Sequence, residues 1–244
     1  MLKVGGTGGM TVMRMIQQAG QSRDKNLEHI ASGQKINKAA DGAASLAVSE
    51  KMRALLGEMS AQIENAEADI SMNQTADGGL EATGDQLARL RELTAQASNG
   101  TMTADDRAHL QAEADQIVQE LDRVAETTEY NTKPVLDDMN AAALGVADFD
   151  VSGGDQALAA VDGAMEQVAT RRGDTGAEIN RARSEIASTQ VARENLTAAE
   201  SQIRDADLAQ EIMGLTKNNL MNQIGVQALN LSRMNMGSVL RLLQ

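Results

Sequence analysis

Apolar side chains recur at spacings of three and four through most of residues 43–99, and this stripe constrains the fold more than any other feature. Such spacing places them on one side of an α-helix, which at 1.5 Å per residue would be about 85 Å long. The chain has a single proline, Pro134, so little in the sequence would break long helices. Asn99 and Gly100 end the stripe, because both residues tolerate the left-handed conformation found at helix ends.

Two shorter helices are predicted on either side of this long one. The first covers residues 10–31 and ends at Ser32-Gly33. The second follows Thr103, whose hydroxyl suits an N-cap. Its buried face is predicted to consist of Leu110, Ala114, Ile117, Leu121 and Val124.

Two further helices are predicted in the second half of the chain. One covers about residues 155–200, and the other starts at Asp205 or Asp207, either of which can cap it, and reaches almost to Gln244. Between the halves, residues 128–154 break the helical pattern and predict a small hairpin and turn region. Because stripes of moderate size need partner helices, we predict an all-α fold, a long antiparallel helical bundle.

Charge divides the chain into two parts. Residues 43–203 carry 12 basic and 29 acidic side chains, whereas residues 1–42 and 204–244 together carry a net charge of +4 and eight of the 14 methionines. An acidic surface suits solvated helices, and methionine-rich ends suit an adaptable packing surface, although ordinary core filling explains the methionines equally well. We expect two domains, 43–203 with the hairpin region, and 1–42 together with 204–244.

The composition excludes several classes of protein. The chain has no cysteine and only two histidines, so it offers no disulfide and almost no ligands for zinc. A net charge of −13 argues against a nucleic-acid partner, and no apolar run approaches the ~18–20 residues that span a membrane. The opening MLKVGGTGGM lacks a charged stretch followed by an apolar run, so no cleaved signal peptide is expected.

Three candidate sites have simpler explanations. The glycine-rich residues 5–9 lack the spacing of a phosphate-binding loop and are expected to form a flexible terminus. His29 and His109 lie far apart, without the paired histidines that a metalloprotease needs, so we expect no metal, no cofactor and no enzymatic activity. The pairs Asp105-Asp106 and Asp137-Asp138 lack the ligand spacing of an EF-hand and fit a solvated acidic surface better.

Five collinear segments carry a resemblance to a known family. The first has a Ser-Gly turn, a basic residue, Ile-Asn, an acidic turn and small residues that open a long helix. The second has an Arg-Glu-Leu core, and the third has an Asp-Arg pair that leads into an aromatic-Asn turn. They are IASGQKINKAADGAASLAVSEKMRA (30–54), LARLRELTAQASNGT (87–101), LQAEADQIVQELDRVAETTEYN (110–131), SQIRDADLAQEI (201–212) and VLRLLQ (239–244). All five resemble segments of the bacterial flagellins.

The resemblance covers roughly residues 10–135 and 155–244 and implies a structural subunit that polymerises into the flagellar filament for swimming. The paired terminal helices would line the central channel as an inner tube. Residues 43–203 would form the surrounding outer tube, with 128–154 facing the outside. Most flagellins carry further domains there, so this chain resembles a short form without them. It departs from the family in its glycine-rich opening, which replaces a start of Ile-Asn-x-Asn type, and in its scarcity of aromatic residues.

The resemblance also implies two sets of contact residues. In the inner tube, the C-terminal stripe would pack against the N-terminal stripe and against adjacent subunits; the residues expected there are Met13, Ile16, Ile224, Ala228, Leu231 and Leu240. A second set matches the flagellin surface that contributes to protofilament contacts and to recognition by the flagellin-sensing Toll-like receptor. Its members are Arg89, Leu93, Gln96 and Glu113.

The partners and location implied by the resemblance are those of an exported filament protein. They are further copies of the chain, the flagellar cap and hook-junction proteins, and an export chaperone, with export to the cell exterior through the flagellar type III apparatus. A hook–filament junction protein is the alternative, but the C-terminal signature and the Asp-Arg segment favour flagellin. A lipid-binding amphipathic module would need basic polar faces, and residues 43–203 are strongly acidic.

Overall fold

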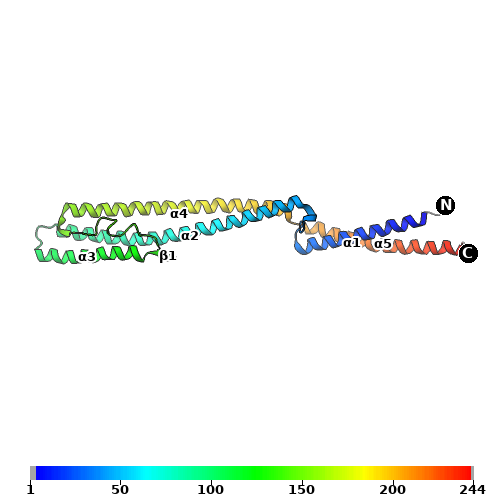
Figure 1. Cartoon of the computed structure of the whole chain (residues 1–244), viewed down its shortest axis with the longest axis horizontal. Helices are drawn as coiled ribbons and strands as arrows, with labels where there is room; N and C mark the ends of the chain where they lie inside the picture. Colours follow the sequence, from blue (N-terminus) through cyan, green and yellow to red (C-terminus); the bar gives the residue numbers. More distant parts are fainter. Residues whose placement is uncertain (1–3, 243–244) are drawn as a thin grey trace. The chain divides into compact units, whose positions relative to one another are not determined.

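The computed structural model describes the backbone of residues 4–242 and the side chains of residues 9–231 and of Met234. Most of this backbone is helical, which confirms the predicted all-α class with a small hairpin region (Figure 1). The helices are α1 (Val4–Ser32), α2 (Ala39–Ala97), α3 (Ala104–Thr127), α4 (Asp155–Arg204) and α5 (Leu208–Leu242).

The chain forms two compact units. The first comprises residues 1–57 together with 193–244, and the second comprises residues 58–192. The sequence-based boundaries, after residue 42 and after residue 203, both fall inside the first unit. The division of the chain is therefore set by something other than its change in charge.

Hydrogen bonds place the start of α2 and the end of α4 in the first unit. The backbone N–H of Lys35 donates to the carbonyl oxygen of Arg204 over 2.8 Å, and the N–H of Ala206 donates to the carbonyl oxygen of Gly33 over 2.9 Å. The Arg204 guanidinium also lies 2.9 Å from the carboxylate of Glu50 on α2. These bonds join the segment after α1 to the segment before α5 and hold the neighbouring helix ends with them.

The second unit has a closed apolar core between α2, α3, α4 and the segment that joins α3 to α4. Helix α3 begins at the predicted N-cap, Thr103, which exchanges hydrogen bonds with Asp106 in a capping box. The predicted inner face of α3 is buried, with Leu110 partly so. The largest fully buried side chains are Leu80, Leu87, Leu90, Leu93, Leu121, Leu136, Val146, Val151 and Val161.

The segment between α3 and α4 forms the predicted hairpin and then covers the core. Strands β1 (Glu129–Tyr130) and β2 (Lys133–Pro134) pair antiparallel, and a short 3₁₀ helix, η1 (Val151–Gly153), precedes α4. Gln111 on α3 fixes this segment, because its side-chain amide donates to the carbonyl oxygen of Phe149 and accepts from the N–H of Val151.

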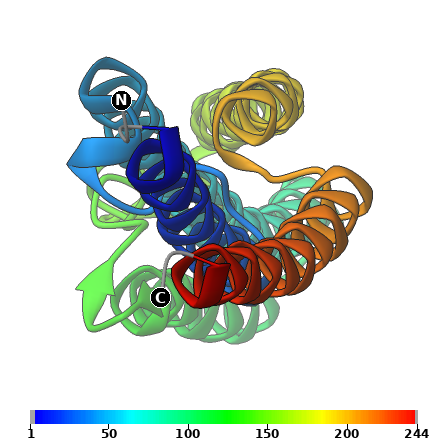
Figure 2. The same ribbon diagram turned by 90° about the vertical axis from the view of Figure 1, so that its right-hand side faces the viewer.

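In the first unit α1 and α5 lie side by side (Figure 2). Helix α1 begins at Val4, so the glycine-rich residues 5–9, which were expected to form a flexible terminus, are helical. Glycine lowers helix propensity without forbidding the helical conformation. Helix α1 ends as predicted, with Gly33 at a φ of 70°. Of the two candidate caps of α5, it is Asp207 whose carboxylate accepts the N–H of Ala209.

The difference between the two units predicts the outcome of limited trypsin digestion of the monomer. The second unit has a closed core, whereas an isolated helix pair such as α1 and α5 is only marginally stable. We expect cleavage at Arg53 and Arg193, near the unit boundaries, and a surviving fragment of residues 54–193 identified by mass spectrometry. Equal protection of α1 and α5 would contradict this expectation.

The turn of the hairpin gives a second prediction. Asn131 and Thr132 have φ values of 51° and 64°, the left-handed pair of a type I′ turn, which suits glycine at its second position. Replacing Thr132 with Gly removes a strain of about 1–2 kcal/mol, which exceeds the entropy of about 0.4–1 kcal/mol that glycine adds to the unfolded chain. Urea unfolding should therefore show a small gain in stability. Thr132→Ala is the control and should show little gain, because alanine keeps the Cβ.

Candidate assembly surface

Two glycines of α5 allow α1 and α5 to approach closely. A Cβ at Gly225 would lie 2.6 Å from Cγ1 of Ile16, and a Cβ at Gly214 would lie 2.8 Å from Nδ2 of Asn26. Carbon and nitrogen atoms do not approach this closely without displacement, so a side chain at Gly225 would displace Ile16, and a side chain at Gly214 would displace the amide of Asn26. The seam between the helices therefore depends on the absence of a side chain at two positions.

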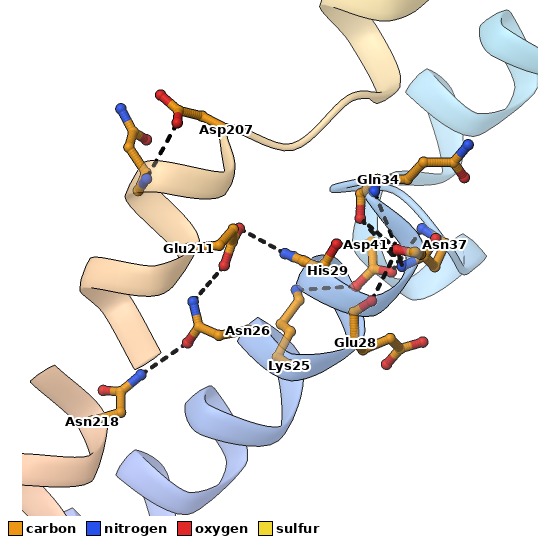
Figure 3. A network of polar contacts seen from close by, with 12 residues as sticks. Lys25, Asn26, Glu28, His29, Gln34, Asn37, Asp41, Asp207, Glu211 and Asn218 are labelled. Atoms are coloured by element: carbon orange, nitrogen blue, oxygen red, sulfur yellow. Dashed lines mark hydrogen bonds and ion pairs between the residues drawn. The ribbon is translucent and has the colours of Figure 1, made fainter. Parts of the chain in front are cut away.

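A chain of polar contacts crosses the same seam (Figure 3). The Asn218 amide donates to Oδ1 of Asn26 over 2.9 Å, and the Asn26 amide donates in turn to Oε2 of Glu211. The other carboxylate oxygen of Glu211 lies 2.8 Å from Nδ1 of His29, which is only 8% exposed. Because buried polar groups must find their partners, these bonds favour one register of α1 against α5.

The carboxyl group of Glu211 is held in its charged form. Partial burial raises the pKa of this group, but the hydrogen bonds from His29 and Asn26 together outweigh it and leave the pKa below its ordinary value. The charge of Glu211 therefore favours the paired state of the two helices.

The turn after α1 is closed by the residues of the 30–54 motif (Figure 3). The Asp41 carboxylate lies 3.0 Å from Lys25 on α1 and accepts the backbone N–H groups of Asn37 and Lys38. The hydrogen bond from Lys25, followed by those from the backbone, lowers the pKa of Asp41. The Ser32 hydroxyl also accepts the side-chain amide of Asn37 over 2.8 Å. The motif thus fixes the turn between α1 and α2.

The opposite face of α5 is apolar and exposed. At about 100° per residue, Glu211, Gly214, Asn218 and Gly225 share one side of α5, facing α1, and the exposed apolar residues share another. Between residues 212 and 231 the sequence has one charged residue, Lys217, and a shallow apolar groove runs along this stretch from Ile212 to Ile224. This exposed apolar surface, the α5 face, consists of Met213, Leu220, Ile224, Ala228 and Leu231.

The residues expected in the inner tube are divided between the seam of α1 with α5 and the exposed surface of these helices. Ile16 packs against α5 at Gly225. In contrast, Met13 is 54% exposed, Ile224 60% and Leu231 61%, so these side chains are not enclosed between α1 and α5 of one chain. Leu240 lies on α5, but its side chain is outside the described residues.

The polar and small residues of the seam were not predicted from the sequence. Glu211, Gly214, Asn218 and Gly225 follow one another at spacings of three, four and seven, which is the periodicity used to find apolar stripes. A search for that periodicity among small and polar residues would have found this side of α5.

The second predicted surface lies on α2 and α3. Arg89 on α2 makes ion pairs with Glu113 on α3, at 2.7 Å, and with Glu92, at 2.5 Å, and Gln96 is exposed. Leu93 is fully buried in the core, because it lies on the inner side of α2 with Leu90. It anchors the helix that carries this surface and is not exposed on it. The two ion pairs are solvated and contribute little stability.

The described part of the chain has neither a cluster of metal-ligating side chains nor a helix that could span a membrane. No cluster of three or more His, Asp or Glu side chains there could hold a metal ion. Across the same residues, no helix combines the length and the apolar character needed to cross a membrane.

Comparison with protein families gives two matches. Residues 9–141 match the bacterial flagellin N-terminal helical region, and residues 158–243 match the bacterial flagellin C-terminal helical region. Residues 142–157 lie between the matches, which is too short a segment for the inserted outer domain of longer flagellins.

Curated relatives align over nearly the whole chain. The flagellar filament 33 kDa core protein of Treponema phagedenis is 34% identical, over 96% of this chain and 97% of its own. The flagellin of Halalkalibacterium halodurans is 36% identical, over 90% and 91%, and that of Bacillus subtilis is 32% identical, over 96% and 97%. A Bacillus cereus flagellin crystal structure matches 52% of this chain and 88% of its own, at 21% identity and a TM-score of 0.45, too low to carry an argument. On the family matches and these relatives, the chain belongs to the bacterial flagellin family.

Proposed function

We propose that the α5 face is the surface through which this flagellin subunit polymerises. Members of the family are structural subunits of the flagellar filament and not enzymes, so the chain is an extracellular filament component that assembles with copies of itself. No observation favours the hook–filament junction alternative.

The main support for this proposal is the exposure of the α5 face to solvent. Its large apolar side chains are each more than half exposed, and they lie on a stretch of 20 residues, 212–231, with a single charge. A contiguous apolar surface of this kind is unfavourable in water and marks an interaction site. The seam with α1 turns this face away from the partner helix of the same chain and leaves it for another chain.

We extend the proposal to the two tubes. The first unit would contribute α1 and α5 to the inner tube, and the second unit would form the outer tube with the segment between α3 and α4 facing outwards. The charge distribution supports this assignment, because residues 43–203 are strongly acidic and the terminal segments are not. Acidic surfaces suit contact with solvent.

Arg89, Gln96 and Glu113 are proposed to form the protofilament contact that also matches the Toll-like receptor surface. The proposal is supported by the exposure of Arg89 and Gln96 and by the ion pair between Arg89 and the half-buried Glu113, which joins α2 to α3. Contacts with the flagellar cap, the hook-junction proteins and an export chaperone, and export by the type III apparatus without a cleaved signal, belong to the same proposal. They rest on the resemblance of the sequence alone.

Replacing Leu231 with Asp tests the α5 face. The change would bury an unpaired charge in each subunit contact, at a cost of several kcal/mol. Since about 1.4 kcal/mol is tenfold in an equilibrium constant, the critical concentration for seeded elongation should rise more than tenfold. The trypsin-resistant fragment of the monomer should be unchanged, because distant sites are additive.

The matched control is Asn219→Asp, which adds the same charge to the same helix outside the α5 face. It should elongate seeds at nearly the wild-type critical concentration. Growth of Leu231→Asp filaments at the wild-type concentration would show that the α5 face is not an assembly surface.

The state of Glu211 predicts a pH dependence of the α1–α5 pair. The pKa of Glu211 is lower in the folded chain than its ordinary value of 4.5. The charged carboxylate therefore stabilises the helix pair fully above about pH 4.5, and this stabilisation is lost as the pH falls through the pKa of the folded chain. We expect seeded elongation and the helicity of the monomer to decline below pH 4.5. Glu211→Gln should elongate less well at pH 6, because it removes the carboxylate that binds both Asn26 and His29, and its elongation should decline less between pH 6 and 3.

The control for this change is Glu194→Gln, at an exposed position on α4. It should keep the wild-type pH profile. A Glu211→Gln profile with the wild-type decline would show that another carboxyl group governs the effect.

A further inference from the structure

We propose that exposed methionines on α1 and α5 form a peroxide-sensitive modification site that controls whether a free subunit can polymerise. The inference rests on the proposed function of the α5 face. The methionines are Met10, Met13, Met15, Met213, Met221 and Met234.

These side chains differ in exposure from the other methionines of the described chain. They are 47–72% exposed, whereas Met139 in the core of the second unit is 6% exposed and Met72 is 36% exposed. The remaining methionines with described side chains are half-buried: Met52, Met59, Met102 and Met165. The sequence contains no cysteine, so thioethers are the only sulfur groups that a peroxide can oxidise here. Exposure governs their susceptibility, and oxidation should begin on α1 and α5.

The position of the α5 methionines makes their oxidation consequential. Counted at about 100° per residue, Met213 points in nearly the same direction as Leu220, Ile224 and Leu231, and Met221 and Met234 flank this direction on either side. All three therefore border or belong to the α5 face. Any subunit contact that covers the α5 face also covers these thioethers.

The chemical step is a two-electron oxidation by hydrogen peroxide or another hydroperoxide. A sulfur lone pair attacks one peroxide oxygen, the O–O bond breaks, and an S–O bond forms. The thioether is oxidised to the sulfoxide, and the hydroperoxide is reduced to water or to the corresponding alcohol. The product is a polar, chiral group that disrupts methionine-rich interfaces, and methionine sulfoxide reductases can reverse the change.

Methionine oxidation would act on free subunits and not on subunits that are already in the filament. In the monomer the six thioethers are open to solvent, and in a filament built through the α5 face those of α5 are covered. A sulfoxide buried in every contact would have to lose its hydration without a matched donor. Oxidised subunits should therefore be rejected at the growing end while the assembled subunits stay reduced.

The test compares the full-length monomer with seeded filaments during treatment with hydrogen peroxide. Mass spectrometry of peptides should show the six methionines oxidised before Met139 in the monomer, and Met213, Met221 and Met234 protected in the filament. Elongation of untreated seeds by oxidised monomer should need at least a tenfold higher critical concentration. Circular dichroism checks that treatment leaves the helices folded.

Two Met→Leu variants make the test specific, each compared with its own untreated sample. Replacing all six methionines should remove the effect of peroxide on the critical concentration, and replacing only Met213, Met221 and Met234 should remove most of it. Met72→Leu, in the second unit, keeps all six and should stay sensitive.

The outcomes separate this inference from the proposed function. Oxidised monomer that elongates seeds at the untreated concentration overturns the inference alone, provided that filaments protect the α5 methionines. Equal oxidation of those methionines in monomer and filament overturns the assembly role of the α5 face as well. Continued sensitivity of the six-residue variant shows that peroxide acts elsewhere, and it also overturns the inference.

Discussion

A helix paired with only one other helix can bury only one of its faces, and the organisation of this flagellin depends on that constraint. In the second unit, α2 meets α3, α4 and the segment between them, so that Leu80 and Leu121 lose all contact with solvent. In the first unit α5 has α1 as its main neighbour, and Ile224 and Leu231 remain more than half exposed. Similar apolar stripes thus form a closed core in one unit and an exposed surface in the other. The number of partner helices determines whether a stripe is buried or exposed.

The face of α5 that meets α1 is the less apolar one, and this choice determines what is left for assembly. Two glycines and the contacts among Asn26, His29 and Glu211 join the helices. Buried polar contacts add little net stability, but they penalise a shifted register because unpaired groups would remain. The pair is therefore specific without being strongly stabilised. It holds α5 in a defined orientation and leaves exposed the apolar residues, whose burial yields the larger free energy and which we propose are covered by another subunit.

The parts of this structure that could be predicted from sequence are those set by local rules. Helix periodicity, the Thr103 cap and the buried face of α3 depend on residues a few positions apart, and each prediction is confirmed. The compact units differ from the predicted domains, because bonds between distant residues, such as that from Lys35 to Arg204, join the end of α4 to the segment after α1. Leu93 was placed on a surface by family resemblance, which transfers residue identity but not the direction of a side chain. The glycine side of the seam was missed because a close approach is visible only in three dimensions.

Charge complements this division between closed and open surfaces. On the surface of the second unit, α2 and α4 are joined by solvated ion pairs such as Arg91–Asp162 and Arg172–Asp77. Each such pair contributes little to the free energy of unfolding, so the stability of this unit depends on its apolar core. Its excess of acidic residues has a different effect, because like-charged surfaces repel within the screening length of about 8 Å at physiological salt. Association through the acidic surfaces is thereby disfavoured, whereas the α5 face, with Lys217 as the one charge in residues 212–231, meets no such barrier. Hydrophobic attraction and electrostatic repulsion thus both favour the assembly through α5 that we propose.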